Sequence, residues 1–173
     1  GLVVDVMRNT GGVIVYGHEI ARRLIPQPFE GVGFELRATA ARVANLSSQY
    51  EISKINGSPD WAVRHWENML ADMKTALSEN RGRTGPLPLD MPSLYVTPAA
   101  VVYTKPIIVL IDEFSVSSAD LFPALMQDSG RATLVGWRTA GMGGTNTTFL
   151  GSAFSEGSAG MTLGLMVRPK PQD

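Results

Sequence analysis

Three serines follow an aliphatic run in the stretch IDEFSVSSADLF, residues 111–122, where the pattern changes from a buried strand to a helix. A serine on such a sharp turn stands at the carboxyl end of a sheet, and the nearby helix amides can stabilise developing negative charge. That arrangement favours nucleophilic catalysis. The simpler interpretation is structural, because Ser117 and Asp120 fit the capping box that satisfies the first amides of a helix. Position alone does not decide between the two.

A second turn of the same kind lies near the start of the chain. RNTGG, residues 8–12, follows the β-branched run LVVDV and precedes apolar residues at helical spacing. Glycines permit positive φ and leave a backbone N–H open to a reacting oxygen, since no Cβ intervenes. Gly11 and Gly12 are therefore candidates for half of an oxyanion hole, and a tight turn without a ligand is the alternative.

The elements around these turns predict an α/β fold built from strand-turn-helix units. We expect strands at 2–6, 34–38, 107–111 and 132–136, helices at 13–24 and from Ser117 to Asp128, a glycine-rich loop at 139–146, and two final strands around a Gly-Ser turn. The core should contain Val3, Val4, Val6, Ile107, Val109 and Leu110 from strands and Ile20, Leu24, Leu121 and Leu125 from helices.

A long helix is predicted after Ser58, which would be its N-cap, with Pro59 at the first helical position and a stop at Gly82. Its apolar stripe is Trp66, Leu70, Met73 and Leu77. The proline-rich segment 84–98 should be a surface connection. The two histidines, His18 and His65, are expected on helix surfaces and not in a catalytic site.

Composition excludes several classes of function. The 173 residues, 44% of them hydrophobic, suit a single domain, and the net charge of −1 offers nucleic acid no basic surface. Cysteine is absent, aliphatic runs are too short to span a membrane, and no ligand spacing indicates a metal or another cofactor. Because a strand pattern begins at residue 2 without any polar lead, we expect 1–173 to be one segment of a longer protein.

The blocks GLVVDVMRNTGG (1–12) and KPIIVLIDEFSVSSADLFPALMQDSGRATLVGWRTAGMGG (105–144) together resemble the catalytic core of the S41 peptidases. This group contains the C-terminal processing proteases, the tricorn core proteases and the chlamydial secreted protease, and GRATLVG and TAGMGG are most similar to the last branch. The resemblance implies a ClpP/crotonase-like fold and a serine endopeptidase that acts on peptides or unfolded proteins. It also suggests a periplasmic or secreted location and is compatible with a homo-oligomer.

The resemblance assigns roles to particular residues. Ser117, five residues before Phe122, matches the nucleophile, and the Ser118 amide would form the oxyanion hole with the amide of Gly11 or Gly12. Asp128 matches a family aspartate at the end of the nucleophile helix, where a structural role is favoured over a catalytic one. The remaining supporting candidates are Asp120, Gly141 and Gly143.

One position departs from the family pattern. The processing proteases carry a lysine general base in a GKG loop, and Met142 stands in its place. A thioether cannot accept a proton from serine at neutral pH. In the tricorn-like and chlamydial branches the resemblance implies an upstream histidine and a downstream glutamate, both outside residues 1–173. The isolated segment is therefore expected to be inactive even if the parent protein is active.

Two other classes of function remain open. A noncatalytic domain that binds peptides or partners is supported by the methionine at position 142. An acyl-CoA enzyme on the same fold would need an oxyanion hole but no serine, and no evident basic or adenine-binding patch supports it. The sequence of the parent gene on both sides of this segment would separate them from a peptidase.

Overall fold

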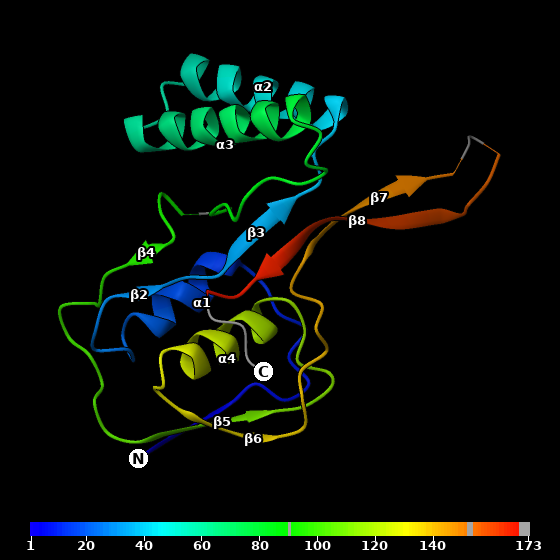
Figure 1. Cartoon of the computed structure of the whole chain (residues 1–173). Helices are drawn as coiled ribbons and strands as arrows, with labels where there is room; N and C mark the ends of the chain where they lie inside the picture. Colours follow the sequence, from blue (N-terminus) through cyan, green and yellow to red (C-terminus); the bar gives the residue numbers. More distant parts are fainter. Residues whose placement is uncertain (90, 152–153, 170–173) are drawn as a thin grey trace. The chain divides into compact units, whose positions relative to one another are not determined.

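The computed structural model describes residues 1–89, 91–151 and 154–169, and it confirms the α/β class. Its elements are β1 (Leu2–Asp5), α1 (Ile14–Ala21), β2 (Phe29–Glu30), β3 (Gly33–Leu36), α2 (Ala40–Ile55), α3 (Asp60–Ser78), β4 (Tyr95–Val96), β5 (Ile107–Ile111), α4 (Ser118–Asp128), β6 (Thr133–Gly136), β7 (Thr145–Leu150) and β8 (Ser158–Val167) (Figure 1). The chain forms two compact units. The first contains residues 1–33, 93–144 and 167 onward, and the second contains 34–92 and 145–166.

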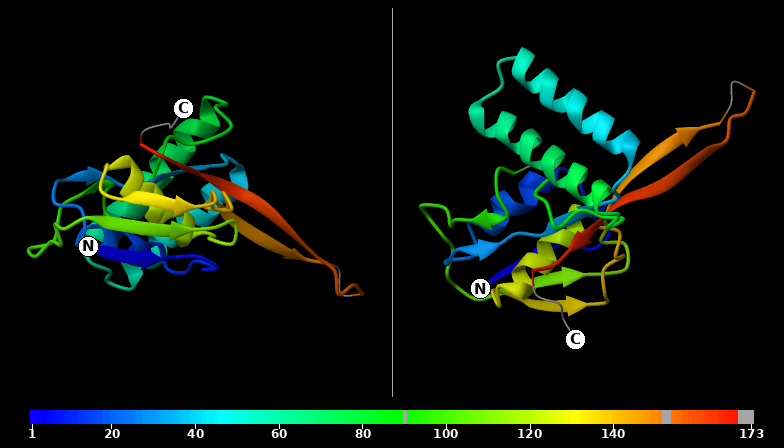
Figure 2. Two further views of the ribbon diagram at one scale, coloured as in Figure 1. Left: turned by 90° about the horizontal axis from the view of Figure 1, so that it is seen from below. Right: turned by 45° about the horizontal axis from the view of Figure 1, so that its top comes forward.

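The first unit is built on a parallel sheet with the strand order β1-β5-β6. Leu2 pairs with Ile107 at one end, and Ile111 pairs with Gly136 at the other. Helices α1 and α4 lie together on one face of this sheet (Figure 2). The core of the unit forms there, with Val109 and Leu125 almost fully buried.

The opposite face of the sheet carries apolar side chains that no element of the described residues covers. Val3 pairs with Ile108 on this face, and these side chains are 60% and 40% exposed. The prediction that Val3 is buried is therefore wrong, and Val4 and Leu110 are only half-buried. Successive strand residues alternate between the two faces, and the helices cover one face alone. The predicted burial of Val6, Ile107 and Val109 is confirmed.

Helix α1 presents a different face to the core from the one predicted. Its buried residues are Gly17, His18 and Ala21, whereas Ile20 is 51% exposed, so the predicted burial of Ile20 is wrong. Close approach of the helices decides the orientation: a Cβ on Gly17 would lie 2.9 Å from Leu121 Cδ2 of α4. Small residues at the crossing allow this contact, so α1 turns Gly17 toward its neighbour. Leu24, Leu121 and Leu125 are buried as predicted.

The second unit contains helices α2 and α3, which pack side by side, and a sheet with the strand order β3-β8-β7 (Figure 1). Helix α2 was not predicted, because its apolar residues do not follow a strong helical period. Its start is nevertheless capped by Thr39, whose hydroxyl accepts a hydrogen bond from the Arg42 amide at 3.2 Å. Strands β7 and β8 pair antiparallel, which confirms the two strands predicted at the end of the chain.

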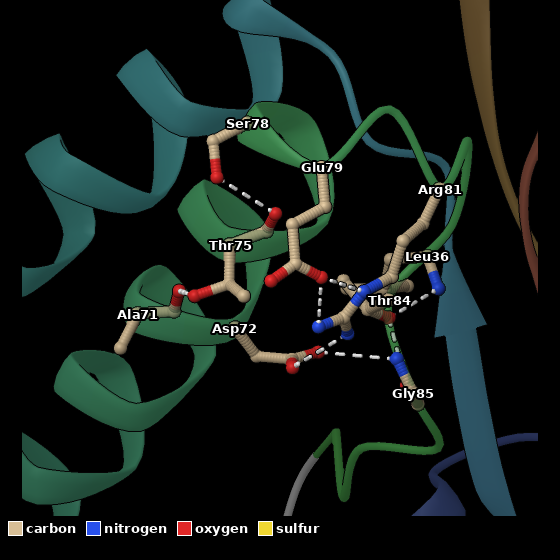
Figure 3. A network of polar contacts seen from close by, with 9 residues as sticks. All are labelled: Leu36, Ala71, Asp72, Thr75, Ser78, Glu79, Arg81, Thr84 and Gly85. Carbon is tan, nitrogen blue, oxygen red and sulfur yellow. Dashed lines mark hydrogen bonds and ion pairs between the residues drawn. The ribbon is translucent and has the colours of Figure 1, made fainter.

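Helix α3 begins at Asp60 with Pro59 at the N-cap, one residue later than predicted, and it ends at Ser78. A polar network fixes its carboxyl end beside β3 (Figure 3). Arg81 Nε donates to Glu79 Oε2 at 2.6 Å, and the Gly85 amide donates to Asp72 Oδ2 at 3.1 Å. The Thr84 hydroxyl accepts from the Leu36 amide at 2.9 Å.

The proline-rich segment 84–98 includes β4, which pairs antiparallel with β2. Leu87 forms an isolated bridge with Phe34, and the side chains of Met91 and Val96 are buried. Among the described residues, no helix has the length and apolar character needed to cross a membrane.

Candidate functional site

The turns after β1 and β5 meet at the carboxyl end of the parallel sheet. The Val116 amide donates to the Asn9 carbonyl oxygen at 2.9 Å, and the Ser115 hydroxyl donates to the Val6 carbonyl oxygen at 2.8 Å. Adjacent parallel strands end at the same edge, so their following turns are brought together by the strand pairing itself. The two segments of sequence singled out for chemistry are therefore neighbours.

Asp112 joins these two turns through its carboxylate. Oδ1 accepts hydrogen bonds from the Arg8 amide at 2.9 Å, the Phe114 amide at 3.1 Å and the Ser115 hydroxyl at 3.1 Å. The Arg8 amide is the main cause that holds the pKa of Asp112 below its ordinary value of 3.8, because these donors stabilise the charged form. Asp112 was not predicted as a site residue, although its position directly after a buried strand is a signal in the sequence.

The three serines have different environments. Ser115 is fully buried and donates its hydroxyl to the backbone, which is a structural role. Ser117 is partly exposed and is the N-cap of α4, so the helix begins where predicted. Its backbone has φ 61° and ψ −120°, outside the regions that a non-glycine residue favours. Such a conformation costs on the order of 1–3 kcal/mol and is concentrated at functional sites.

Gly11 is pressed directly against the Ser117 turn. A Cβ on Gly11 would lie 2.5 Å from the Val116 carbonyl oxygen and 2.6 Å from Ser117 Cβ, and its φ is +88°. Glycine is therefore required here both by its conformation and by the space available. The Gly11 amide donates to Asn9 Oδ1 at 2.8 Å. For the part of the chain that the structure describes, the amides of Gly12 and Ser118 have no hydrogen-bond acceptor.

Asp120 connects the Ser117 turn to the glycine-rich loop. Oδ2 accepts from the Ser117 amide at 2.8 Å, which is the carboxylate half of the capping box, and also from the Met142 amide at 3.1 Å. Oδ1 accepts from the Gly141 amide at 2.9 Å. Asp120 is buried, whereas the Met142 side chain is 64% exposed. One carboxylate thus holds residues 117, 141 and 142 together.

Of the loop glycines, Gly143 is buried, and Gly141 has a φ of +72°. The Ala140 amide donates to the Ser115 carbonyl oxygen at 3.0 Å, which adds a second connection between the loop and the Ser117 turn. The loop therefore lies beside the serine.

Asp128, at the end of α4, forms a two-pronged ion pair with Arg168. Arg168 Nε donates to Asp128 Oδ2 at 3.0 Å, and a second guanidinium nitrogen contacts Oδ1. The same guanidinium donates to Gln127 Oε1 at 3.0 Å. Bidentate pairs of this type fix geometry strongly. The contacts made by Asp128 connect α4 to the segment that follows β8.

Both histidines are buried, so the prediction that they lie on helix surfaces is wrong. His18 is 1% exposed because α1 turns this residue toward the core, and Nδ1 lies 3.3 Å from the Ile14 carbonyl oxygen. His65 is 8% exposed, with Nε2 2.9 Å from the Leu89 carbonyl oxygen. Among the described residues, no three His, Cys, Asp or Glu side chains gather as a metal site would require.

An apolar pocket of about 200 Å³ adjoins the two turns. Gly11, Gly12 and Ser118 contribute to its wall, together with side chains from β1, α1 and α4. The residues at positions 11–12 and 118, distant in sequence, therefore border one cavity. Asn9 also borders it; its place in the RNTGG turn, where Asn commonly bonds to a backbone amide two residues later, was the sequence signal for its role.

The model of peptidase family S41 matches residues 1–169. An uncharacterized protein of Chlamydia muridarum is 30% identical over 162 residues, which cover 83% of this chain and 27% of that protein. The crystal structure of mature CPAF is similar with a TM-score of 0.76 and 25% identity, covering 97% of this chain and 36% of CPAF. A peptidase structure from Parabacteroides merdae has a TM-score of 0.62 at 19% identity, over 98% of this chain and 40% of that one, and it supports the fold alone. The chain spans about a quarter of the length of the curated relatives that it matches.

Proposed function

The chain belongs to peptidase family S41, and we propose that it carries the nucleophile and the oxyanion hole of a serine endopeptidase. The observation that carries the proposal is the backbone of Ser117. This residue adopts a positive φ at the carboxyl end of a parallel sheet, with Gly11 of the neighbouring turn packed against it. A capping serine alone does not require this conformation, since N-cap residues normally lie in the β region.

In the proposed reaction, Ser117 Oγ forms a bond to the carbonyl carbon of a peptide, and its proton passes to a base. The negative charge that develops on the carbonyl oxygen is stabilised by the amides of Gly12 and Ser118. The Gly11 amide is already bonded to Asn9 Oδ1, so Gly11 would contribute by allowing close approach of the turns. The C–N bond then breaks, the amine leaves with the proton, and water hydrolyses the resulting ester.

We propose that the general base comes from a part of the protein outside residues 1–173. Met142, in the loop beside Ser117, has no group that accepts a proton at neutral pH. His65 Nε2 lies 2.9 Å from a backbone carbonyl oxygen of the second unit. His18 is on the buried side of α1, with Nδ1 3.3 Å from the Ile14 carbonyl oxygen. We therefore do not propose either imidazole as the base.

The other candidate residues would act by positioning. Asp120 would hold the Ser117 turn against the loop that contains Gly141 and Gly143, because its carboxylate accepts three backbone hydrogen bonds there. Asp128 would hold the end of α4 through Arg168. Substrates would be peptides or unfolded proteins, and we propose a periplasmic or secreted location.

A noncatalytic peptide-binding domain is the second candidate, and the methionine at position 142 is the observation in its favour. It would keep the pocket and the backbone amides but would not form an ester with substrate. The two candidates therefore differ in one covalent step at Ser117.

The full-length parent protein provides the test, with Ser117→Ala compared with Ser118→Ala. We expect Ser117→Ala to abolish peptide hydrolysis and labelling by a fluorophosphonate, while Tm falls by no more than about 2–4 °C, since a lost N-cap costs about 1 kcal/mol. Ser118→Ala is the matched control, because it removes a hydroxyl but keeps the backbone amide. Equal hydrolysis by Ser117→Ala and wild type would overturn the proposal, and a protein that is inactive and unlabelled from the start would favour the binding domain.

A further inference from the structure

A second pocket, of about 370 Å³, lies within the second unit, between helices α2 and α3, the end of β3 and the start of β7. Helix α2 lines it with one face, because the residues that it contributes stand at positions i, i+3, i+4 and i+7: Arg42, Asn45, Leu46 and Gln49. The proposed nucleophile belongs to the first unit. This pocket is therefore built from different residues than the proposed peptidase site.

Two polar groups of the pocket wall have no hydrogen-bond partner among the described residues. They are Arg42 Nε and Thr145 Oγ1, and both atoms are buried. Gly164 packs against the threonine, since a Cβ on Gly164 would lie 2.8 Å from Thr145 Oγ1. A buried polar group without a partner is unfavourable, so folded proteins retain few of them. Two such groups in one wall indicate a ligand that bonds to both.

The chemistry of these groups requires a ligand that accepts hydrogen bonds. An arginine Nε can only donate, and a threonine hydroxyl can donate as well. In the part of the chain that the structure describes, Arg42 has no acidic partner, and no Asp or Glu lines the pocket. Arg42 also stands in the first turn of α2, where no acidic residue offsets the positive end of the helix. The pocket therefore has an uncompensated positive charge and favours an anion.

The geometry of the guanidinium narrows the kind of anion. Its Nε and one terminal nitrogen point side by side, which matches the two oxygens of a carboxylate. The single charge of Arg42 balances one carboxylate, whereas a phosphate dianion would leave an excess negative charge without a partner.

The rest of the wall indicates what the carboxylate is attached to. Much of it is apolar, with contributions from Leu36, Leu46, Trp66 and Met69. The volume is within the roughly 300–1,000 Å³ that is usual for small-molecule sites, and one water occupies only about 30 Å³ of liquid. A carboxylate without an apolar body would therefore leave most of this wall uncovered.

We propose that this pocket binds a small monocarboxylic acid with a compact apolar body. The carboxylate accepts hydrogen bonds from Arg42 and Thr145, and the apolar body lies against Trp66 and Met69. The side-chain amides of Asn45 and Gln49 supply further donors on the same face of α2. The inference does not depend on the proposed peptidase function, because none of these residues takes part in it.

The test is isothermal titration calorimetry of the full-length parent protein at pH 7 and constant ionic strength. The probes are benzoate, benzamide as its neutral isostere, acetate and inorganic phosphate. We expect benzoate to bind at least about 10-fold more tightly than benzamide, because hydrogen bonds to a charged partner are stronger. It should also bind at least about 10-fold more tightly than acetate, because its phenyl group buries apolar surface.

Three results of the titrations would overturn the proposal. The first is no binding of benzoate at about 10 mM. The second is an equal Kd for benzoate and benzamide, which would show that the charge is not recognised. The third is tighter binding of phosphate than of benzoate, which would show a site for inorganic anions.

Substitutions in the wall assign the binding to this pocket. Arg42→Gln should weaken benzoate binding about 10-fold or more, and Thr145→Val about 3-fold or more. Neither variant should lower Tm, because neither side chain loses a hydrogen-bond partner in the free protein. Arg64→Gln is the matched control, since Arg64 is an exposed arginine of α3 that does not line the pocket. Its Kd should equal that of wild type.

Unchanged benzoate binding in folded Arg42→Gln and Thr145→Val proteins would contradict the proposal. An equal loss of binding in Arg64→Gln would contradict it as well, since it would show attraction to positive charge in general. If both wall variants lower Tm and leave the preference for benzoate over benzamide intact, their role is structural and the site is wrong.

The Ser117→Ala protein separates this inference from the proposed function. Its Kd for benzoate should equal that of wild type, because Ser117 does not line this pocket. Loss of benzoate binding in Ser117→Ala would place the carboxylate at the serine and overturn the pocket assignment. If the wild-type protein hydrolyses no peptide but binds benzoate through Arg42, the proposed function fails and the carboxylate site stands.

Discussion

At the scale of single residues, the candidate site depends on contacts that only glycine permits. Gly11 combines a φ of +88° with a position where an added Cβ would lie 2.5 Å from the Val116 carbonyl oxygen and 2.6 Å from Ser117 Cβ. Any Cβ at this position must displace the turn that carries the proposed nucleophile. Ser117 itself is held at a positive φ by the Asp120 carboxylate and by the neighbouring turn. A substitution at Gly11 is therefore expected to change the backbone conformation of Ser117 as well.

Gly11→Ala should lower the free energy of unfolding by about 1–3 kcal/mol through backbone strain, and the overlap with the Val116 carbonyl oxygen adds to this loss. Urea denaturation of the full-length protein measures the change. Peptide hydrolysis should fall as well, because the oxyanion donors and Ser117 would move apart. Gly85→Ala is the control, since a Cβ there meets nothing within 4 Å. A Gly11→Ala protein as stable and active as wild type would show that the two turns are less tightly packed than described.

At the scale of elements, Asp112 couples the end of β1 to the end of β5. Its carboxylate accepts from Arg8 after one strand and from Phe114 and Ser115 after the other. These hydrogen bonds favour the charged form and lower the pKa of Asp112 in the folded state below 3.8. The charge on the Asp112 carboxylate therefore stabilises both the pairing of β1 with β5 and the geometry of the turns that follow them.

The sign of the pH effect follows from that lowered pKa. The stabilisation is fully present above the unfolded value of about 3.8 and is lost as the pH falls through the lower folded value. Asp112→Asn should therefore be less stable than wild type at pH 7, and the difference should shrink below about pH 4. Urea denaturation at several pH values measures this, with Glu113→Gln as a neighbouring exposed control. A difference that stays constant from pH 7 to pH 2.5 would argue against the role of the Asp112 charge.

At the scale of the whole molecule, residues 1–173 contain the proposed nucleophile and oxyanion amides but not the proposed base. The apolar outer face of the β1-β5-β6 sheet, with Val3 and Ile108 exposed, belongs to the same unit as Ser117. The chain spans about a quarter of its curated relatives. We propose that catalysis requires the remainder of the parent protein.

Expressed alone, residues 1–173 should therefore be a poor peptidase. Loss of general-base catalysis lowers the rate by about 10²–10⁴-fold, and by more when catalytic groups act as a unit. Comparing kcat/KM of the isolated chain and the parent for one activated ester measures the loss, once circular dichroism and a cooperative thermal transition show that the isolated chain is folded. Equal activity of a folded isolated chain and the parent would locate the base within residues 1–173.

The strand-turn-helix units and the place of Ser117 at the start of α4 could be predicted from the sequence. These features are local: β-branched runs, glycine turns and the start of α4 are each specified within about a dozen residues. The pairing of parallel strands then requires that the turns after β1 and β5 share one edge. The identity of the family followed from the same segments, because they contain its motifs.

The buried face of each element and the pairing of distant polar groups depend on how the elements pack together. Ile20 is exposed and His18 is buried because α1 approaches α4 at Gly17, a contact that helical periodicity does not reveal. The hydrogen bonds that the Gly141 and Met142 amides donate to Asp120, and that the Arg8 amide donates to Asp112, join residues 21, 22 and 104 positions apart. Helix α2 was not predicted because its apolar residues show only a weak helical period. Its helical state becomes evident from its packing against α3. Such long-range contacts depend on packing, which local propensity does not determine.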